Sequence, residues 1–345
     1  MPLIRKAKLL SHLMMINQPT TKRIIISGHY GFGNTGDEAI LGAMIHQLDR
    51  RSPGCQFTVI SENPEVTEKL HATAAVHRSD YTATSRAVEQ ADLVITGGGG
   101  IFQDHHQITI ADLFARPGFG ITSYAVVPLL AAMHGKPLMM YAQGIGPLFS
   151  KESKTFVTFI CRLAEVITTR DQASKNLLKE IGVEGDKIFV AVDPAFEIPE
   201  ASAKEVERIF AEEHVPRDKK IICISVRQWV DTSFKEKYLE TIARAVGKFL
   251  AGTDAHLLFV PFQDYDQSNR DAAPALKVIE QIGLNEKGRC HLLSRVYHPR
   301  EIAGIMRQAT LVVGMRLHSI IFAVRCHIPV VALSPRSRVA RAFHI

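Results

Sequence analysis

The sequence predicts an α/β protein made of two Rossmann-like domains whose parallel sheets face a common cleft. The first indication is length, because 345 residues exceed the roughly 150 that one domain commonly uses. The second is the alternation, after Thr21, of short apolar runs with amphipathic helical patterns, which is typical of parallel sheets with crossover helices. The third is an interruption of this alternation between Pro194 and Pro199, which places a domain boundary between residues 198 and 199.

Each domain is expected to repeat a strand–helix unit, its strands being short β-rich runs that end at glycine, aspartate or arginine. In the N-terminal domain, residues 22–198, we expect strands at Arg23–Ser27, Gln56–Ser61, Asp92–Thr96, Leu138–Ala142, Val166–Thr169 and Lys187–Ala191. The helices between them are expected at Asp37–Asp49, Ser85–Gln90, Thr122–His134, Ser153–Leu163 and Asp171–Ile181.

The C-terminal domain, residues 199–345, is expected to start with a charged helix, Ala203–Glu213. Its strands are expected at Lys220–Ser225, His256–Val260, Cys290–Leu293, Thr310–Val313 and Pro329–Leu333. Helices are expected near 234–250, 272–282, 300–307 and 318–325. After the last strand only twelve residues remain, so we expect a domain that is shortened at its C-terminus.

Composition narrows the class of protein. A hydrophobic content of 46% with 22% charged residues is typical of a globular chain that buries ordinary cores. The five cysteines are scattered, odd in number and form no C-x-x-C pair, which favours reduced thiols in a cytoplasmic protein over disulfides or structural zinc. His105-His106 lacks metal-ligand spacing, so no metal is expected. The net charge of +6 is dispersed, which disfavours a nucleic-acid partner.

Residues 1–21 are expected to form a disordered leader or a short basic amphipathic segment. Basic residues precede the apolar run Leu9–Ile16, but Ser11 and His12 interrupt that run, and Asn17-Gln18-Pro19 offers no small-residue cleavage site. Elsewhere the longest apolar stretches, such as Ile121–Met133, are shorter than the ~18–20 residues that span a bilayer. Any membrane contact is therefore expected to be peripheral, at the cytoplasmic face.

The first glycine loop formally matches a dinucleotide-binding motif. Residues 31–36 read G-x-G-x-x-G between a strand and a helix, and Glu62 follows the second strand where a ribose-binding acid would lie. However, Asp37 and Glu38 open the helix and would compete with a pyrophosphate for the same amides. Thr35 with Glu38 instead predicts a capping box. A loop of this composition suits neutral sugar hydroxyls better than NAD.

Other motifs also follow strands, where α/β sheets bind ligands. Gly97–Gly100 predicts either a close approach of a ligand to backbone amides or a tight turn that starts a helix. Asp171 is expected to cap a helix, and Asp193 before Pro194 to form a turn.

The most informative stretch is Gly314-Met315-Arg316-Leu317-His318-Ser319, which puts a cation and an imidazole where a buried strand passes into a helix. A histidine there carries protons near neutral pH, and arginine binds phosphate or carboxylate in a bidentate manner. Arg227, beside the sole tryptophan Trp229, follows another strand and predicts a second cation for an anionic substrate.

Read in order, these blocks resemble the polysaccharide pyruvyl transferase family. The matching pieces are residues 31–41, Gly97–Gly100 with Gln103-Asp104, residues 143–147, Arg170-Asp171 with Ser174, residues 193–196, residues 227–229, residues 261–263 and residues 314–319. They span about 24–333, and the first and last are the most distinctive. The sequence is most similar to the bacterial cell-wall branch, which pyruvylates an N-acetylmannosamine-containing lipid-linked precursor for anchoring S-layer proteins.

The resemblance implies a GT-B-like fold, phosphoenolpyruvate as donor, no cofactor, and a ketal across two sugar hydroxyls with release of phosphate. It implies His318 as the general acid/base and Arg316 and Arg227 as ligands of the donor. Arg338 is expected to replace a family lysine that also faces the donor. The acceptor sugar is expected at the glycine loops of the N-terminal domain, at Asn34, Gly36, Asp37, Glu38, Gly98, Gly99, Gln103 and Asp104.

The C-terminal end departs from the family pattern. The family usually continues with a Tyr-Asp-Pro-Lys-Val-like segment, whereas residues 335–343 here lack the aspartate. Two alternatives therefore stay open: a GT-B glycosyltransferase that uses a nucleotide sugar, and an inactive sugar-binding relic.

Overall fold

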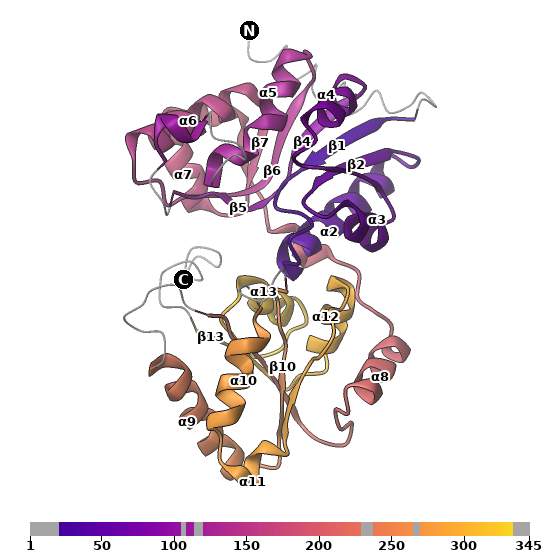
Figure 1. The fold of residues 1–345 in the computed structure, drawn as a ribbon, viewed down its shortest axis with the longest axis vertical. Coiled ribbons are helices and arrows are strands. Elements are labelled where there is room, and N and C mark those ends of the chain that lie inside the picture. Colours follow the sequence, from indigo (N-terminus) through magenta and orange to yellow (C-terminus); the bar gives the residue numbers. More distant parts are fainter. Residues whose placement is uncertain (1–20, 105–107, 114–119, 229–236, 265–269, 334–345) are drawn as a thin grey trace.

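The computed structural model describes residues 21–104, 108–113, 120–228, 237–264 and 270–333, which form two α/β lobes (Figure 1). Residues 1–20 of the predicted leader (1–21), His105-His106, Trp229 and Arg338 lie outside the described residues. Along the described chain, no helix combines the length and the apolarity needed to cross a membrane.

The N-terminal lobe is built on a parallel sheet in the order β3-β2-β1-β4-β6-β7-β8. Its strands are β1 (Arg23–Ser27), β2 (Gln56–Ser61), β3 (Ala74–His77), β4 (Leu93–Thr96), β6 (Leu138–Ile145), β7 (Val166–Thr169) and β8 (Ile188–Val190). A further short strand, β5 (Gly99–Phe102), pairs with the end of β6. The central strands are buried on both faces, which explains their continuous apolar runs.

Helices connect these strands and cover the sheet. They are α2 (Thr35–Arg51), α3 (Pro64–His71), α4 (Tyr81–Glu89), α5 (Val126–Met133), α6 (Lys151–Leu163) and α7 (Gln172–Glu180). Short 3₁₀ turns lie at η1 (Ile110–Leu113), η2 (Gly120–Tyr124), η3 (Gly185–Lys187) and η4 (Pro194–Glu197). Asp171 caps α7 as expected, since its carboxylate accepts the Ser174 amide hydrogen at 2.6 Å.

The C-terminal lobe repeats the plan on a smaller parallel sheet in the order β11-β10-β9-β12-β13. Its strands are β9 (Ile221–Ser225), β10 (His256–Phe259), β11 (Cys290–Leu292), β12 (Leu311–Gly314) and β13 (Val330–Ala332). Its helices are α8 (Ala203–Glu212), α9 (Lys237–Ala251), α10 (Ala272–Gln281), α11 (Leu284–Lys287), α12 (Pro299–Met306) and α13 (Leu317–Arg325). The prediction of two Rossmann-like lobes with parallel sheets is therefore confirmed, while the boundary between residues 198 and 199 stays a prediction.

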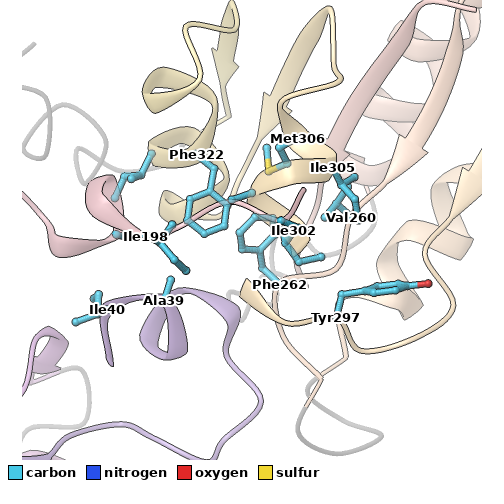
Figure 2. Packing of buried hydrophobic residues seen from close by; sticks show 14 of the residues in the cluster. Ala39, Ile40, Ile198, Val260, Phe262, Tyr297, Ile302, Ile305, Met306 and Phe322 are labelled. Atoms are coloured by element: carbon cyan, nitrogen blue, oxygen red, sulfur yellow. The ribbon is translucent and has the colours of Figure 1, made fainter. Parts of the chain in front are cut away.

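The two lobes share one buried apolar cluster. Ala39 and Ile40 of α2 lie against Ile198, Phe262 and Phe322 (Figure 2), and these five side chains are almost completely inaccessible to solvent. The helix that follows the first glycine loop thus belongs to the interface between the lobes. Burial of this kind contributes about 25 cal/mol per Å² of apolar surface, so it holds α2 firmly against α13 and η4.

Two expectations about local structure are wrong. The glycine run Gly97–Gly100 neither makes a tight turn nor starts a helix. Its last two residues belong to β5 (Gly99–Phe102), which pairs with β6. The capping box of Thr35 and Glu38 does not form, because the carboxylate of Glu38 is bonded elsewhere and Asn34 caps α2 instead. Residues 64–77, over which no helix or strand is expected from the sequence, form α3 and β3.

Candidate active site

The loop after β1 attaches the N-terminus of α2 to the C-terminal lobe. The side-chain oxygen of Asn34 accepts the amide hydrogens of Gly36 at 3.0 Å and Asp37 at 3.2 Å, which is ordinary N-capping. The Asn34 amide nitrogen donates to Oε1 of Gln263, after β10, at 2.8 Å. Asn34 also forms an antiparallel bridge with Gln263, and the Thr35 amide donates to the Phe262 carbonyl at 2.9 Å. The contacts of Asn34 and Thr35 with Gln263 and Phe262 join the glycine loop to the edge where β10 ends.

His318 lies in the first turn of α13, at the carboxyl end of β12, and its ring rests on Gly36. A Cβ atom on Gly36 would overlap the imidazole, so only glycine allows this approach of the two lobes. The His318 side chain is 12% exposed. Its Nε2 lies 3.7 Å from Oδ2 of Asp193, too far for a hydrogen bond, and within the described residues Nε2 has no hydrogen-bond partner.

Asp193 holds the charge next to that imidazole. It starts η4, where its Oδ1 accepts the Ala195 amide hydrogen at 3.0 Å, and its Oδ2 lies 3.1 Å from Nη1 of Arg170. Burial opposes ionisation of Asp193, but the His318 ring, Arg170 and the Ala195 amide outweigh it and hold its pKa well below the usual range. Asp193 is therefore a fixed anion that stabilises positive charge on His318 whenever the ring is protonated.

Arg170 supplies a cation that the sequence reasoning did not single out. It follows the buried strand β7, and its guanidinium lies over the backbone of β6, where a Cβ atom on Gly144 would come within 2.7 Å of Nε. The sequence signal is an arginine directly after a short strand. Arg227 and Arg316 likewise follow the ends of strands β9 and β12.

Asp37, in the first turn of α2, brings a buried carboxylate to the same place. Burial is the main cause of its raised pKa, with a smaller contribution from Glu38, while His29, His318 and Arg170 act in the opposite direction. Gly99 approaches this carboxylate with φ of +110°, and a Cβ atom there would lie 2.7 Å from Oδ1.

Glu38, the next residue, is used by the fold. Its Oε1 accepts the Gly31 amide hydrogen at 2.7 Å, and its Oε2 lies 2.8 Å from Nε2 of the buried His71. This carboxylate closes the glycine loop onto α3 and has no oxygen left for a ligand.

The second glycine run is also held mainly by protein contacts. The Gln103 side-chain amide bonds to the Gly100 carbonyl, and Gly98 packs against the backbone of β6. Asp104 is buried and accepts hydrogen bonds from the backbone of Ile108 and from the backbone and hydroxyl of Ser150. These bonds, with one from Ser153, outweigh burial and lower its pKa to about 2.

In the C-terminal lobe, Arg316 is paired with an acid that the sequence analysis did not identify. Its Nε and Nη2 donate to the two carboxylate oxygens of the buried Asp271, at 2.9 and 2.6 Å. The same Asp271 accepts the Phe262 amide hydrogen at 3.1 Å. These bonds to Asp271 do not use Nη1 of Arg316. Arg227 follows β9, and the backbone carbonyl of Arg227 accepts the Tyr238 hydroxyl hydrogen at 2.6 Å.

The structure thus brings five residues to one place at the junction of the lobes: Gly36, Asp37, Arg170, Asp193 and His318. They combine a titratable ring, two carboxylates of different acidity and a cation, which suits proton transfer to and from an anionic substrate. Within the ranges that the structure describes, no three His, Cys, Asp or Glu side chains are placed to hold a metal ion.

The sequence matches a family model over residues 34–337, described as polysaccharide pyruvyl transferase. The chain belongs to the polysaccharide pyruvyl transferase family. The matched range starts at Asn34 and contains all five residues of the junction site. The site therefore lies wholly within the range that matches the pyruvyl transferase family.

Solved structures with a similar fold are distant in sequence. A UDP-N-acetylglucosamine 2-epimerase from Neisseria meningitidis bound to UDP-GlcNAc shares 12% identity with a TM-score of 0.59, covering 94% of this chain and 85% of the epimerase. A glycosyltransferase from Rickettsia africae shares 13% identity with a TM-score of 0.56, at 92% and 81% coverage. The E. coli ADP-heptose LPS heptosyltransferase II shares 12% identity with a TM-score of 0.51, covering 90% of this chain and 84% of the heptosyltransferase. At this identity they establish the GT-B-like fold of the pyruvyl transferase.

Proposed function

We propose that this pyruvyl transferase moves pyruvate from phosphoenolpyruvate to two hydroxyls of a sugar, forming a ketal and releasing phosphate. The observation that carries the proposal is the His318 ring, held between Gly36 and the ionised Asp193 at the junction of the lobes. Family membership supports pyruvyl transfer, and the site supplies the groups that this chemistry requires.

Ketal formation requires several proton transfers. The methylene carbon of phosphoenolpyruvate must gain one proton, which makes C2 an oxocarbenium-like electrophile, and two sugar hydroxyls must each lose one. His318 is the proposed acid that protonates the methylene carbon, because its side chain is only 12% exposed at the junction of the lobes and its Nε2 lies 3.7 Å from the Asp193 carboxylate. The second released proton leaves on the phosphate, so the overall reaction balances.

The donor carries a carboxylate and a phosphate, and therefore needs cations. We propose that Arg170, Arg227 and Nη1 of Arg316 bind these groups, with Asp271 fixing the plane of the Arg316 guanidinium. Arg338 remains a proposed fourth ligand of the donor. Bidentate contacts to such oxygens would fix C2 and the methylene carbon relative to His318.

The acceptor is proposed to enter from the glycine loops of the N-terminal lobe. Because Asn34, Glu38 and Asp104 are bonded within the protein, the side-chain contact to the sugar falls mainly to Asp37. Gly98 and Gly99 remain proposed contacts of the acceptor through their backbone, since the space on their Cβ side is occupied by β6 and by Asp37. We propose a lipid-linked sugar, N-acetylmannosamine in a cell-wall precursor, which would bring the enzyme to the cytoplasmic face of the membrane.

The test is a competition between donors. Purified protein is incubated with a synthetic β-N-acetylmannosaminyl lipid analogue and either phosphoenolpyruvate or UDP-sugars, and the acceptor is analysed by mass spectrometry. The proposal expects a product heavier by one pyruvic acid less one water, only with phosphoenolpyruvate. Glycosyl transfer from a UDP-sugar would instead support a glycosyltransferase, and acceptor binding without any product would support an inactive relic.

A further inference from the structure

Asp37 is a buried carboxylate that the fold does not use. It is 9% exposed, and across the described parts of the chain no group donates a hydrogen bond to its carboxylate oxygens. The adjacent Glu38 is the internal contrast, because both of its oxygens are bonded to the Gly31 amide and to His71. Buried polar groups are nearly always hydrogen-bonded, so a carboxylate left without a partner indicates a function.

Asp37 lies among the other charged groups of the junction site. Gly99 lies against Oδ1, and a Cβ atom there would come within 2.7 Å of that oxygen, so only glycine accommodates the carboxylate in this position. Arg170 and His318 act on its charge from the other elements of the junction site. On the far side His29 is fixed, since its Nδ1 lies 2.8 Å from the Tyr124 hydroxyl and its ring stacks on Phe32 at 4.0 Å.

Two opposing effects set the proton affinity of Asp37. Burial, and to a lesser degree Glu38, raise its pKa, whereas His29, His318 and Arg170 lower it, and the net direction is upward. The amides at the N-terminus of α2 also favour the ionised form. In its ionised form, a carboxylate with a raised pKa binds protons more strongly than an exposed aspartate and is the better general base.

We propose that Asp37 is a second proton carrier of the reaction, the general base for the first sugar hydroxyl that attacks C2. This inference rests on the proposed function. It assigns one proton transfer to each lobe, Asp37 in the N-terminal lobe and His318 in the C-terminal lobe. His318 gives a proton to the methylene carbon while the first hydroxyl oxygen bonds to C2 and its proton passes to Asp37.

The second half of the reaction restores both groups. The bond between C2 and the bridging oxygen breaks, the phosphate leaves with the proton from Asp37, and the second hydroxyl oxygen bonds to C2. Neutral His318 takes the proton of that second hydroxyl. One proton has then reached carbon and one phosphate, the two hydroxyls have lost one each, and no redox partner is required.

The test compares Asp37→Asn with Asp49→Asn, a matched change on the exposed last turn of the same helix. Asparagine keeps the shape of the side chain but cannot accept the proton. In Asp37→Asn we expect kcat for ketal formation to fall by about 10²–10⁴-fold, while the Kd for phosphoenolpyruvate, measured by calorimetry, stays within about threefold. Asp49→Asn is expected to keep wild-type kcat.

The pH profile separates proton transfer from positioning. Wild-type kcat should rise with pH as Asp37 ionises, and the residual rate of Asp37→Asn should lack that acid limb, while Asp37→Glu should regain part of kcat with the limb displaced. If Asp37→Asn keeps kcat within threefold, or loses rate with an unchanged acid limb, the inference is overturned. If the wild type makes no ketal from phosphoenolpyruvate in this assay, the proposed function itself fails and the inference with it.

Discussion

The Cα of Gly36, in the first turn of α2, lies directly against the imidazole ring of His318, in the first turn of α13. The two residues are far apart in the sequence and come from different lobes, yet a single methyl group would not fit between them. The arrangement of the site therefore depends on the absence of a side chain at one position.

Gly36→Ala is accordingly expected to displace His318 by about 1 Å and to lower kcat at least 10²-fold, because errors of that size remove productive geometry. Steady-state phosphate release measures the effect. Gly247→Ala in α9 is the control: a Cβ atom there meets nothing within 4 Å, so this change should keep full activity and stabilise the helix by about 0.5–1 kcal/mol. Full activity of Gly36→Ala would show that the close approach has no functional importance.

Arg170 and Asp193 form a buried pair, with exposed fractions of 14% and 5%. Arg170→Gln leaves the Asp193 anion with His318 alone, and we expect it to lower the free energy of unfolding by about 3 kcal/mol, measured by urea denaturation. The double variant Arg170→Gln/Asp193→Asn removes the uncompensated charge as well. Its stability should recover part of the loss, and strictly additive losses would argue that the two side chains do not interact.

Asp104 links stability to pH. Its pKa is about 2 in the folded chain against the ordinary aspartate value of 3.8, so its contribution is present above pH about 4 and is lost as pH falls toward 2. Asp104→Asn should lower the free energy of unfolding by on the order of 1 kcal/mol at pH 6, after allowance for solvent screening, and by less near pH 2. Denaturation at the two pH values checks this, and an equal loss at both would assign the effect to packing instead of charge.

The sequence predicts strongly apolar strands well, because runs such as Arg23–Ser27 and Ile221–Ser225 are buried on both faces of a parallel sheet and show it in their composition. The sequence does not predict β3, Ala74–His77, because this short strand at the edge of the sheet contains no strongly apolar run. The chain carries no comparable local signal there, and only pairing with β2 makes the strand.

For the site, local pattern finds residues that follow strands, which is why His318 and Arg316 are visible from the sequence. It does not reveal partners. The pairing of Arg316 with Asp271, and of Asp193 with Arg170, joins positions 45 and 23 residues apart and arises only when the strand ends meet. Likewise, nothing in the order of Asp37 and Glu38 tells which carboxylate is bonded to the fold and which is left for a ligand.

The measurement that tests the central claim most directly is acceptor-dependent phosphate release from phosphoenolpyruvate, comparing the wild type with His318→Ala. Circular dichroism and donor binding confirm that the variant is folded and still binds phosphoenolpyruvate. We predict release in the wild type only when the acceptor is present, with the ketal seen by mass, and a loss of at least 10²-fold in the variant. Equal rates in the two proteins, or no release from folded wild type with an intact acceptor, would contradict the account.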